Sequence, residues 1–148
     1  MDNMAEVFRN KFATYRKLLD EAGEKTAWDT LFGGYPERQK AKMGPMIEGT
    51  TLTTGFSSAI ANYKQMGMDM VIHDISNNGQ DAVLEIQKAC PSLDNGWHTE
   101  YGVEKPCHVI CEMDIAATEA AFPNIKGSIL SRMADGDCVC LFKYERPK

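Results

Sequence analysis

The spacing of hydrophobic positions predicts that the chain begins with a long helix. Apolar side chains recur at helical intervals, at Phe8, Phe12, Tyr15, Leu19 and Ala22. The charged side chains lie mostly off this stripe. Asn3 is a suitable cap for the start of the helix, with Glu6 placed to complete a capping box, and Gly23 is a suitable stop.

Further helices are expected up to Gly67. A short helix is predicted over Thr26–Phe32, and a basic, methionine-containing segment, Glu37–Met43, follows it and is closed by Gly44-Pro45. Thr54–Met66 has a stripe of aromatic, methionine and aliphatic side chains, which predicts another helix. Such a stripe is more typical of a protein core than of a cofactor site. The first 67 residues are therefore predicted to be mainly helical.

The pattern changes to that of strands after Gly67. Asp69–Ser76 is rich in β-branched residues and ends at Asn77-Asn78-Gly79, which is typical of a turn. The next segment, residues 82–89, is interpreted as a returning strand, and a helix from Gln80 is the alternative. Residues 91–106 contain many Pro, Gly, Asn and Asp residues and are expected to form a loop or a short helix.

The last third of the chain is predicted to contain three more strands and a short helix. Cys107–Met113 is an apolar, β-branched run and is predicted to be a strand, followed by a helix over Ala116–Phe122. Ser128–Met133 and Cys138–Tyr144 flank a turn and are predicted to form a hairpin.

This order of elements predicts an α+β fold, with N-terminal helices packed on a mainly antiparallel sheet of four or five strands. The 148 residues fit one domain over 1–148, with a helical part at 1–67 and a sheet part at 68–148 that carries all five cysteines. A chain of this length buries roughly 70% of its unfolded surface, so it has no need of disulfides or metals to form a core.

Charge and composition exclude several classes of function. The net charge of −5 is unsuited to binding phosphate backbones, so no nucleic-acid partner is expected. The N-terminus has no apolar run of the kind found in signal peptides, and no uncharged stretch is suited to crossing a bilayer. We therefore expect a cytoplasmic protein with reduced thiols, a small-molecule substrate, no membrane partner, and the possibility of a homo-oligomer.

Five cysteines are the most informative residues for chemistry. In the predicted strands, residues two apart share a face, so Cys107 and Cys111 would lie on one side of their strand and Cys138 and Cys140 on one side of the last strand. If the two strands are neighbours, up to four sulfur atoms face one space, with Cys90 at its rim. Core packing, a reactive thiol and metal ligation all remain open at this point.

A reactive thiol needs a nearby base or positive charge that lowers its pKa. His98 lies in the predicted loop and is free to turn toward the cysteines, whereas His108 would point to the face of the strand opposite Cys107. We therefore expect His98 to lie nearer to the cysteines than His108. Taken singly, each histidine is more typical of a surface or hydrogen-bonded residue.

The order of several short motifs resembles a known family. The motifs are Cys90-Pro91, then Cys107-x-x-x-Cys111-Glu112-x-Asp114, then Pro123-Asn124, and finally Gly136-Asp137-x-x-Cys140-x-Phe142. Together they are similar to the L-2-amino-thiazoline-4-carboxylic acid hydrolase-like family, over roughly residues 81–144. Cys138 and His108 fall outside this pattern.

The resemblance implies a hydrolase that opens a cyclic amidine or thiazoline-like ring. A cysteine thiolate would attack the carbon and water would resolve the covalent intermediate. The candidate catalytic residues are Cys107, Cys111, Asp114, Asp137, Cys140 and His98, and the candidate substrate-binding residues are Arg132, Glu112 and Cys90. No cofactor is expected, with zinc held by the cysteines as the alternative route. The alternative function is a non-catalytic small-molecule or metal-binding domain with a cysteine-lined pocket.

Overall fold

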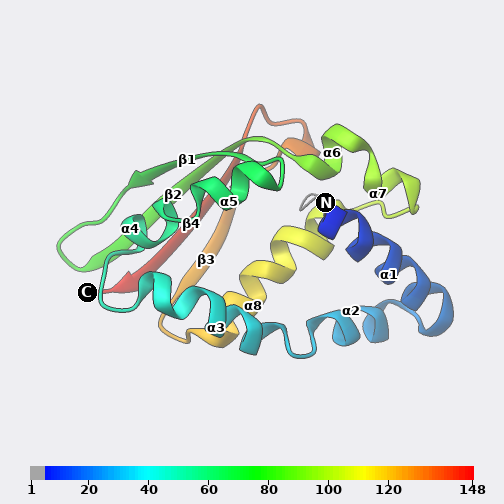
Figure 1. The fold of residues 1–148 in the computed structure, drawn as a ribbon, viewed down its shortest axis with the longest axis horizontal. Coiled ribbons are helices and arrows are strands. Elements are labelled where there is room, and N and C mark those ends of the chain that lie inside the picture. Colours follow the sequence, from blue (N-terminus) through cyan, green and yellow to red (C-terminus); the bar gives the residue numbers. More distant parts are fainter. Residues whose placement is uncertain (1–5) are drawn as a thin grey trace.

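The computed structural model describes residues 6–148 and shows an α+β fold (Figure 1). Its sheet has four strands in the spatial order β1-β2-β4-β3, and each neighbouring pair is antiparallel. The strands are β1 (Asp69–Asp74), β2 (Gln80–Ala89), β3 (Lys126–Ser131) and β4 (Cys140–Pro147). The predicted fold class is therefore confirmed. The predicted helix cap, Asn3, lies outside the described residues.

The helices occupy most of the rest of the chain. Those before the sheet are α1 (Glu6–Ala22), α2 (Glu24–Phe32), α3 (Tyr35–Ile47), α4 (Leu52–Ser57) and α5 (Ile60–Gln65). Those between β2 and β3 are α6 (Pro91–Asn95), α7 (Trp97–Glu100), the π-helical turn η1 (His108–Glu112) and α8 (Met113–Ala121). No helix within residues 6–148 is long and apolar enough to span a membrane.

Two of the predicted helix boundaries are wrong. Helix α3 continues through Gly44-Pro45 to Ile47, because Met43 and Ile47 are both buried in the core and this burial outweighs the hydrogen bond that proline lacks. The predicted helix Thr54–Met66 is two helices instead. The chain turns at Ser58, whose hydroxyl donates a hydrogen bond to the carbonyl oxygen of Gly55 at 2.6 Å.

The predicted strand Cys107–Met113 is also wrong, because this segment is helical. Cys107 has helical backbone angles, and η1 leads directly into α8. Val109 and Met113, four residues apart, are both fully buried, and Val109 packs with Phe12 and Tyr15 of α1. Tertiary burial on one helical face thus overrides the strand propensity of the β-branched residues.

Several helices are layered against the sheet and against each other (Figure 1). Helices α4 and α5 contact β1, α4 also contacts β2, and α8 contacts β3 at the other edge. Helix α3 contacts both α4 and α8, and so bridges the two sides, while α1 packs on α2, α7 and η1. This arrangement surrounds a space above the middle of the sheet.

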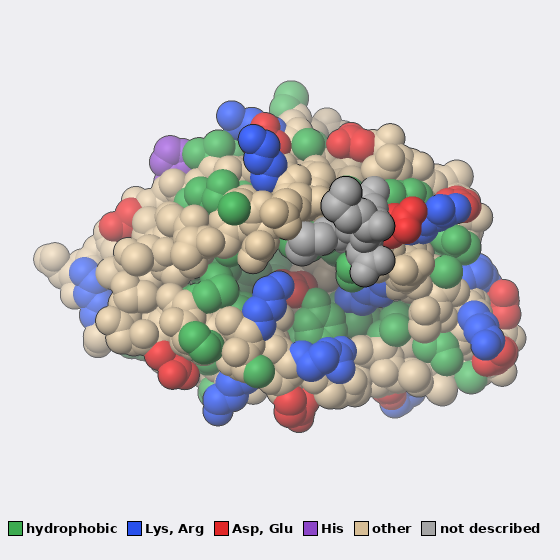
Figure 2. Space-filling view, viewed as in Figure 1, with side chains coloured by type: hydrophobic (Ala, Val, Ile, Leu, Met, Phe, Trp, Pro, Cys, Tyr) green, Lys and Arg blue, Asp and Glu red, His purple; other side chains and the backbone are tan. Residues whose placement is uncertain are grey.

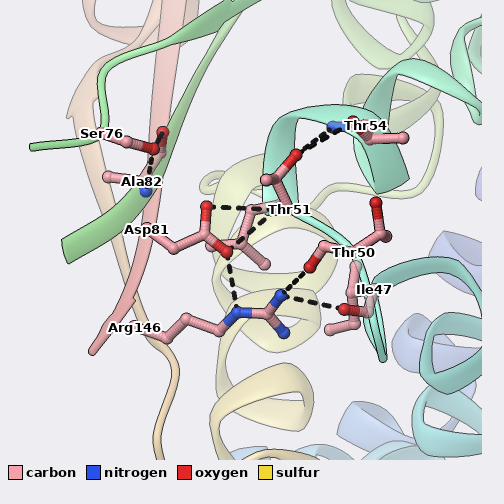
Figure 3. Close-up of polar contacts among 9 residues, drawn as sticks. Ile47, Thr50, Thr51, Thr54, Ser76, Asp81, Ala82 and Arg146 are labelled. Carbon is pink, nitrogen blue, oxygen red and sulfur yellow. Dashed lines mark hydrogen bonds and ion pairs between the residues drawn. The ribbon is translucent and has the colours of Figure 1, made fainter. Parts of the chain in front are cut away.

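A largely buried ion pair fixes the connection between α3 and α4 (Figure 3). Arg146 and Asp81 face each other across β4 and β2, and Nε of Arg146 donates to Oδ2 of Asp81 at 2.9 Å. Nη2 of Arg146 also donates to the carbonyl oxygens of Ile47 at 2.9 Å and Thr50 at 2.5 Å, and Asp81 accepts from the backbone N–H of Leu52. The connection is therefore held to the sheet by polar contacts.

Asp81→Ala is expected to lower the free energy of unfolding by about 3 kcal/mol, because it leaves the largely buried guanidinium of Arg146 without its carboxylate partner. The matched control is Lys25→Ala, which removes an exposed ion pair on α2 and should leave stability unchanged. Urea unfolding of the two variants provides the measurement. A wild-type midpoint for Asp81→Ala would show that the ion pair does not stabilise this connection.

Candidate functional site

A cavity of about 240 Å³ lies between the helices and the sheet. It opens as a hollow on the face of the molecule shown in Figure 2, with hydrophobic and acidic side chains inside it. Its wall consists mainly of methionine and aromatic side chains. They come from both the helices and the sheet, namely from α1, α3, α4, α5, α8, β1, β2 and β4. Prominent lining residues are Phe56, Tyr63, Met66, Met68, Met70 and Phe142.

The most unusual lining residue is Glu85, in the middle of β2. Strand pairing places it in one row across the sheet with Ile72 of β1, Phe142 of β4 and Ile129 of β3. Its side chain is buried, with only 3% of the residue exposed. Oε2 has no hydrogen-bond partner among the described residues. A polar group in this state is costly, because folding removes its water without replacing it.

Burial changes the acidity of Glu85. Desolvation raises its pKa to about 8, the Tyr63 hydroxyl opposes part of this rise, and the negative charge of Asp114 adds to it. Burial also raises the pKa of Tyr63 well above its usual value. At neutral pH the carboxyl group is therefore mainly protonated.

A second carboxyl group in the cavity, Asp114 on α8, already has partners. Its Oδ1 accepts a hydrogen bond from the Tyr35 hydroxyl at 2.6 Å and another from Nε2 of Gln39 at 3.2 Å. Lys11 lies nearby, with Nζ 4.8 Å from the centre of the Tyr35 ring. Burial lowers the pKa of Lys11 to about 8, and the charge of Asp114 opposes this shift. Asp114 is therefore part of a polar network that links α8 to α3.

A smaller pocket of about 20 Å³ is lined by four cysteines, namely Cys90, Cys107, Cys111 and Cys140. The sequence predicted that cysteines share one space, but it placed Cys107 and Cys111 on a strand. In the structure, Cys107 and Cys111 share a face because they are four residues apart on a helical turn, and they lie opposite Cys140 of β4. The fifth, Cys138, lies before β4 and is exposed. Cys111 lines both cavities, so the two adjoin.

Burial makes three thiols of this pocket, those of Cys107, Cys111 and Cys140, poor nucleophiles at neutral pH. Burial raises the pKa of Cys107 to about 11, although the charge of Arg132 opposes the shift. Burial also raises the pKa of Cys111 well above its usual value and raises that of Cys140, whose Sγ accepts a hydrogen bond from the backbone N–H of Met133 at 3.2 Å. A thiolate, the reactive form, is therefore disfavoured at each of these positions.

Some predicted site residues lie beside the cysteine pocket and not in it. Arg132 lines the pocket and approaches Oε1 of Glu112 at 3.5 Å, whereas Glu112 is not among the lining residues described. Oδ2 of Asp137 accepts a hydrogen bond from the backbone N–H of Arg132 at 2.9 Å, in an exposed turn. The structure thus separates Asp114, in the large cavity, from Asp137 in the turn.

Neither candidate histidine is among the described residues that line either cavity. Nδ1 of His98 lies 3.3 Å from the carbonyl oxygen of Ser92, and Ser92 lines the cysteine pocket. His108 stacks on Trp28, with 4.5 Å between the ring centres. Within residues 6–148, no group of three or more His, Cys, Asp or Glu side chains is placed to hold a metal ion. Zinc binding stays a prediction. So does the expectation that His98 lies nearer to the cysteines than His108.

The sequence analysis missed Glu85, Tyr63 and Tyr35 as site residues. The segment around Glu85 is predicted to be a strand, but no site role is predicted for its polar side chains. Val83, Glu85 and Gln87 are in fact all buried on one face, whereas Leu84 and Ile86 on the other face are only partly buried. A signal was present, because polar residues that alternate with apolar ones near the middle of a long strand are placed either in water or in a site.

No protein-family model matches the chain, and no curated protein matches it. Among solved structures, the chain is similar to the phenol-responsive sensory domain of the transcription activator PoxR, crystallised with phenol. The similarity covers 94% of this chain and 74% of the PoxR chain, with a TM-score of 0.60 and 13% sequence identity. At this identity the likeness shows a shared fold.

Alkylation by iodoacetamide, followed by mass-spectrometric mapping of each cysteine, tests the raised thiol pKa values. At pH 7.5, Cys107, Cys111 and Cys140 are expected to react more than tenfold more slowly than the exposed Cys138, because little thiolate forms at a buried thiol. Their labelling should accelerate as the pH rises above 10. Fast labelling of Cys107 or Cys111 at neutral pH would contradict this picture.

The pH dependence of stability tests the buried state of Glu85. Its folded pKa of about 8 exceeds its usual value of 4.5, so the stability that it contributes is present below pH 4.5 and is lost as the pH rises toward 8. Glu85→Gln should therefore be more stable than wild type at pH 9, by at least about 1 kcal/mol in urea unfolding, and similar to it at pH 4.5. Glu104→Gln, at an exposed loop position, is the control. Equal pH profiles for wild type and Glu85→Gln would refute the burial of this carboxyl group.

Proposed function

We propose that this chain is a small-molecule-binding domain whose ligand occupies the cavity over the centre of the sheet. The observation that carries the proposal is a cavity of about 240 Å³ whose apolar wall holds the buried carboxyl group of Glu85, with its Oε2 lacking a hydrogen-bond partner among the described residues. An apolar cavity of about 150 Å³ is already large enough to take up benzene. Ligand sites typically combine such an apolar wall with a few convergent polar groups.

The lining residues suit a small ligand with an apolar body. The cavity lies below the size range of about 300–1,000 Å³ that is typical of sites for drug-sized molecules. Methionine side chains such as Met66, Met68 and Met70 are flexible and polarizable, so they adapt to ligands of different outline. One aromatic ring with a short polar substituent fits this description.

The fold supports the same proposal. The PoxR domain has a similar arrangement of elements and is described as phenol-responsive, with phenol in its crystal structure. A shared fold does not transfer a ligand, so phenol serves for this chain as a probe. The proposal for this chain itself rests on its cavity.

A cysteine-dependent hydrolase of the thiazoline-carboxylate type is the second candidate. The observation in its favour is the convergence of four cysteines on one pocket beside the large cavity. The raised pKa values of Cys107 and Cys111 oppose it, because the mechanism needs a thiolate. A rapidly alkylated pocket thiol at neutral pH would favour the hydrolase over a binding domain.

Thermal unfolding with phenol and other small monocyclic probes tests the binding function. A probe at about 100 times its Kd should raise the Tm by roughly 5 °C or more, since a ligand stabilises the state that binds it. Ala59→Phe places a ring into the cavity and should abolish this shift, whereas Ile60→Phe, on the neighbouring exposed position of α5, should retain it.

The absence of a shift with every probe in the wild-type protein would contradict the proposed function. Retention of the full shift in a folded Ala59→Phe variant would also contradict it, because the ligand would then bind elsewhere. Met66→Trp serves as a second variant that fills the cavity if Ala59→Phe does not fold.

A further inference from the structure

Glu85 lines the cavity and has a buried side-chain oxygen without a hydrogen-bond partner among the described residues. It lies between Ile72 and Phe142 in the row across the sheet, where the other side chains are apolar. With 3% of the residue exposed, it has little access to water. Its Oε2 lacks a partner among residues 6–148, although the residue lines a cavity with room for one. The described part of the chain therefore supplies no hydrogen-bond partner to Oε2 of Glu85, and in the ionised carboxylate this partner has to be a donor.

The other charged groups of the cavity do not meet this need. Lys11 lies beside Asp114, which interacts with it electrostatically and also accepts hydrogen bonds from α3. Lys42 is exposed, and its charge is therefore well hydrated. Of the two acidic residues in the cavity wall, Glu85 is therefore the one that pairs with no basic side chain among the described residues.

The walls near Glu85 are suited to a positive charge. Tyr144 of β4 and Tyr63 of α5 line the cavity with it. Aromatic faces attract cations through their quadrupole, and this attraction strengthens when water is excluded. Methionine sulfur adds a polarizable surface to the same wall.

We infer that the ligand is an organic ammonium ion, a protonated amine carried on a small apolar body, and that Glu85 pairs with its nitrogen. The inference rests on the proposed function and names the class of ligand that the cavity takes. The ammonium group would donate to the unpartnered Oε2, and the apolar body would lie among the methionine and aromatic side chains. A neutral hydroxyl compound is the competing occupant, because a protonated Glu85 is also able to pair with it.

The two classes of occupant differ in their response to pH. An ammonium ion pairs with the ionised carboxylate, so its binding displaces the proton of Glu85, and affinity rises as the pH increases from 6 to 8. A neutral alcohol shows no such rise. The titratable or charged groups around Glu85 are Tyr63, Asp114 and Tyr144, with Lys11, Lys42, Tyr35 and Cys111 elsewhere on the cavity wall.

Isothermal titration calorimetry with benzylamine and benzyl alcohol tests the inference, since these probes share a skeleton and differ in charge. At pH 8, the wild-type protein should bind benzylamine at least about tenfold more tightly than benzyl alcohol. Glu85→Gln keeps the shape and removes the charge, so it should lose this preference and the pH dependence of benzylamine binding. Because Lys11 loses charge over a similar pH range, only the part of the pH dependence that Glu85→Gln abolishes is assigned to Glu85. Glu104→Gln, outside both cavities, should behave as wild type.

The possible outcomes separate this inference from the proposed function. Equal or tighter binding of benzyl alcohol by the wild-type protein would overturn the ammonium inference and leave a neutral-ligand domain. An unchanged preference for benzylamine in Glu85→Gln would overturn the role of Glu85. Binding of phenol without binding of either benzyl probe would also reject the inference alone, whereas failure of all three probes would count against both proposals.

Discussion

The carboxyl group of Glu85 lies at the centre of the sheet face that the helices cover, and the layout of the domain depends on how this group is accommodated. A side chain of this kind cannot be packed against hydrocarbon without a large desolvation cost. Helices α4 and α5 contact the sheet on the β1 side, and α8 contacts it at β3. Between these contacts, above Glu85 and Phe142, a cavity of about 240 Å³ remains. The carboxyl group thus lies where a closed core would otherwise be expected.

Polar contacts keep the surrounding helices in place around this opening. The ion pair between Asp81 and Arg146 fixes the connection between α3 and α4 to β2 and β4 (Figure 3). On the opposite side, Asp114 of α8 accepts hydrogen bonds from Tyr35 and Gln39 of α3. Hydrogen bonds of this kind are directional, so they set the spacing of the elements more strictly than apolar contacts do. Helix α3 is therefore held by polar contacts near both ends.

The fold class was predictable because the period of the hydrophobic pattern changes after Gly67, and local pattern is what decides between helix and strand. The helical structure of Cys107–Met113 was not predictable, because its β-branched residues favour a strand. Only the burial of Val109 and Met113 against distant partners makes the segment helical. The convergence of Cys107, Cys111 and Cys140 was predicted, but from a strand that is in fact helical, and the same spacing argument wrongly placed the exposed Cys138 with them. The alternation around Glu85 is compatible with either water or a site, and the sequence does not decide between them, since the layer that covers β2 comes from helices far away along the chain.

A crystal structure of the protein grown with benzylamine tests the central claim, that the cavity is a ligand site organised by Glu85, most directly. The account predicts electron density for the ring among the methionine and aromatic side chains of the cavity, with the amino nitrogen within about 3 Å of a carboxyl oxygen of Glu85. An empty cavity at a saturating concentration, or a bound molecule whose nitrogen lies away from Glu85, would contradict it.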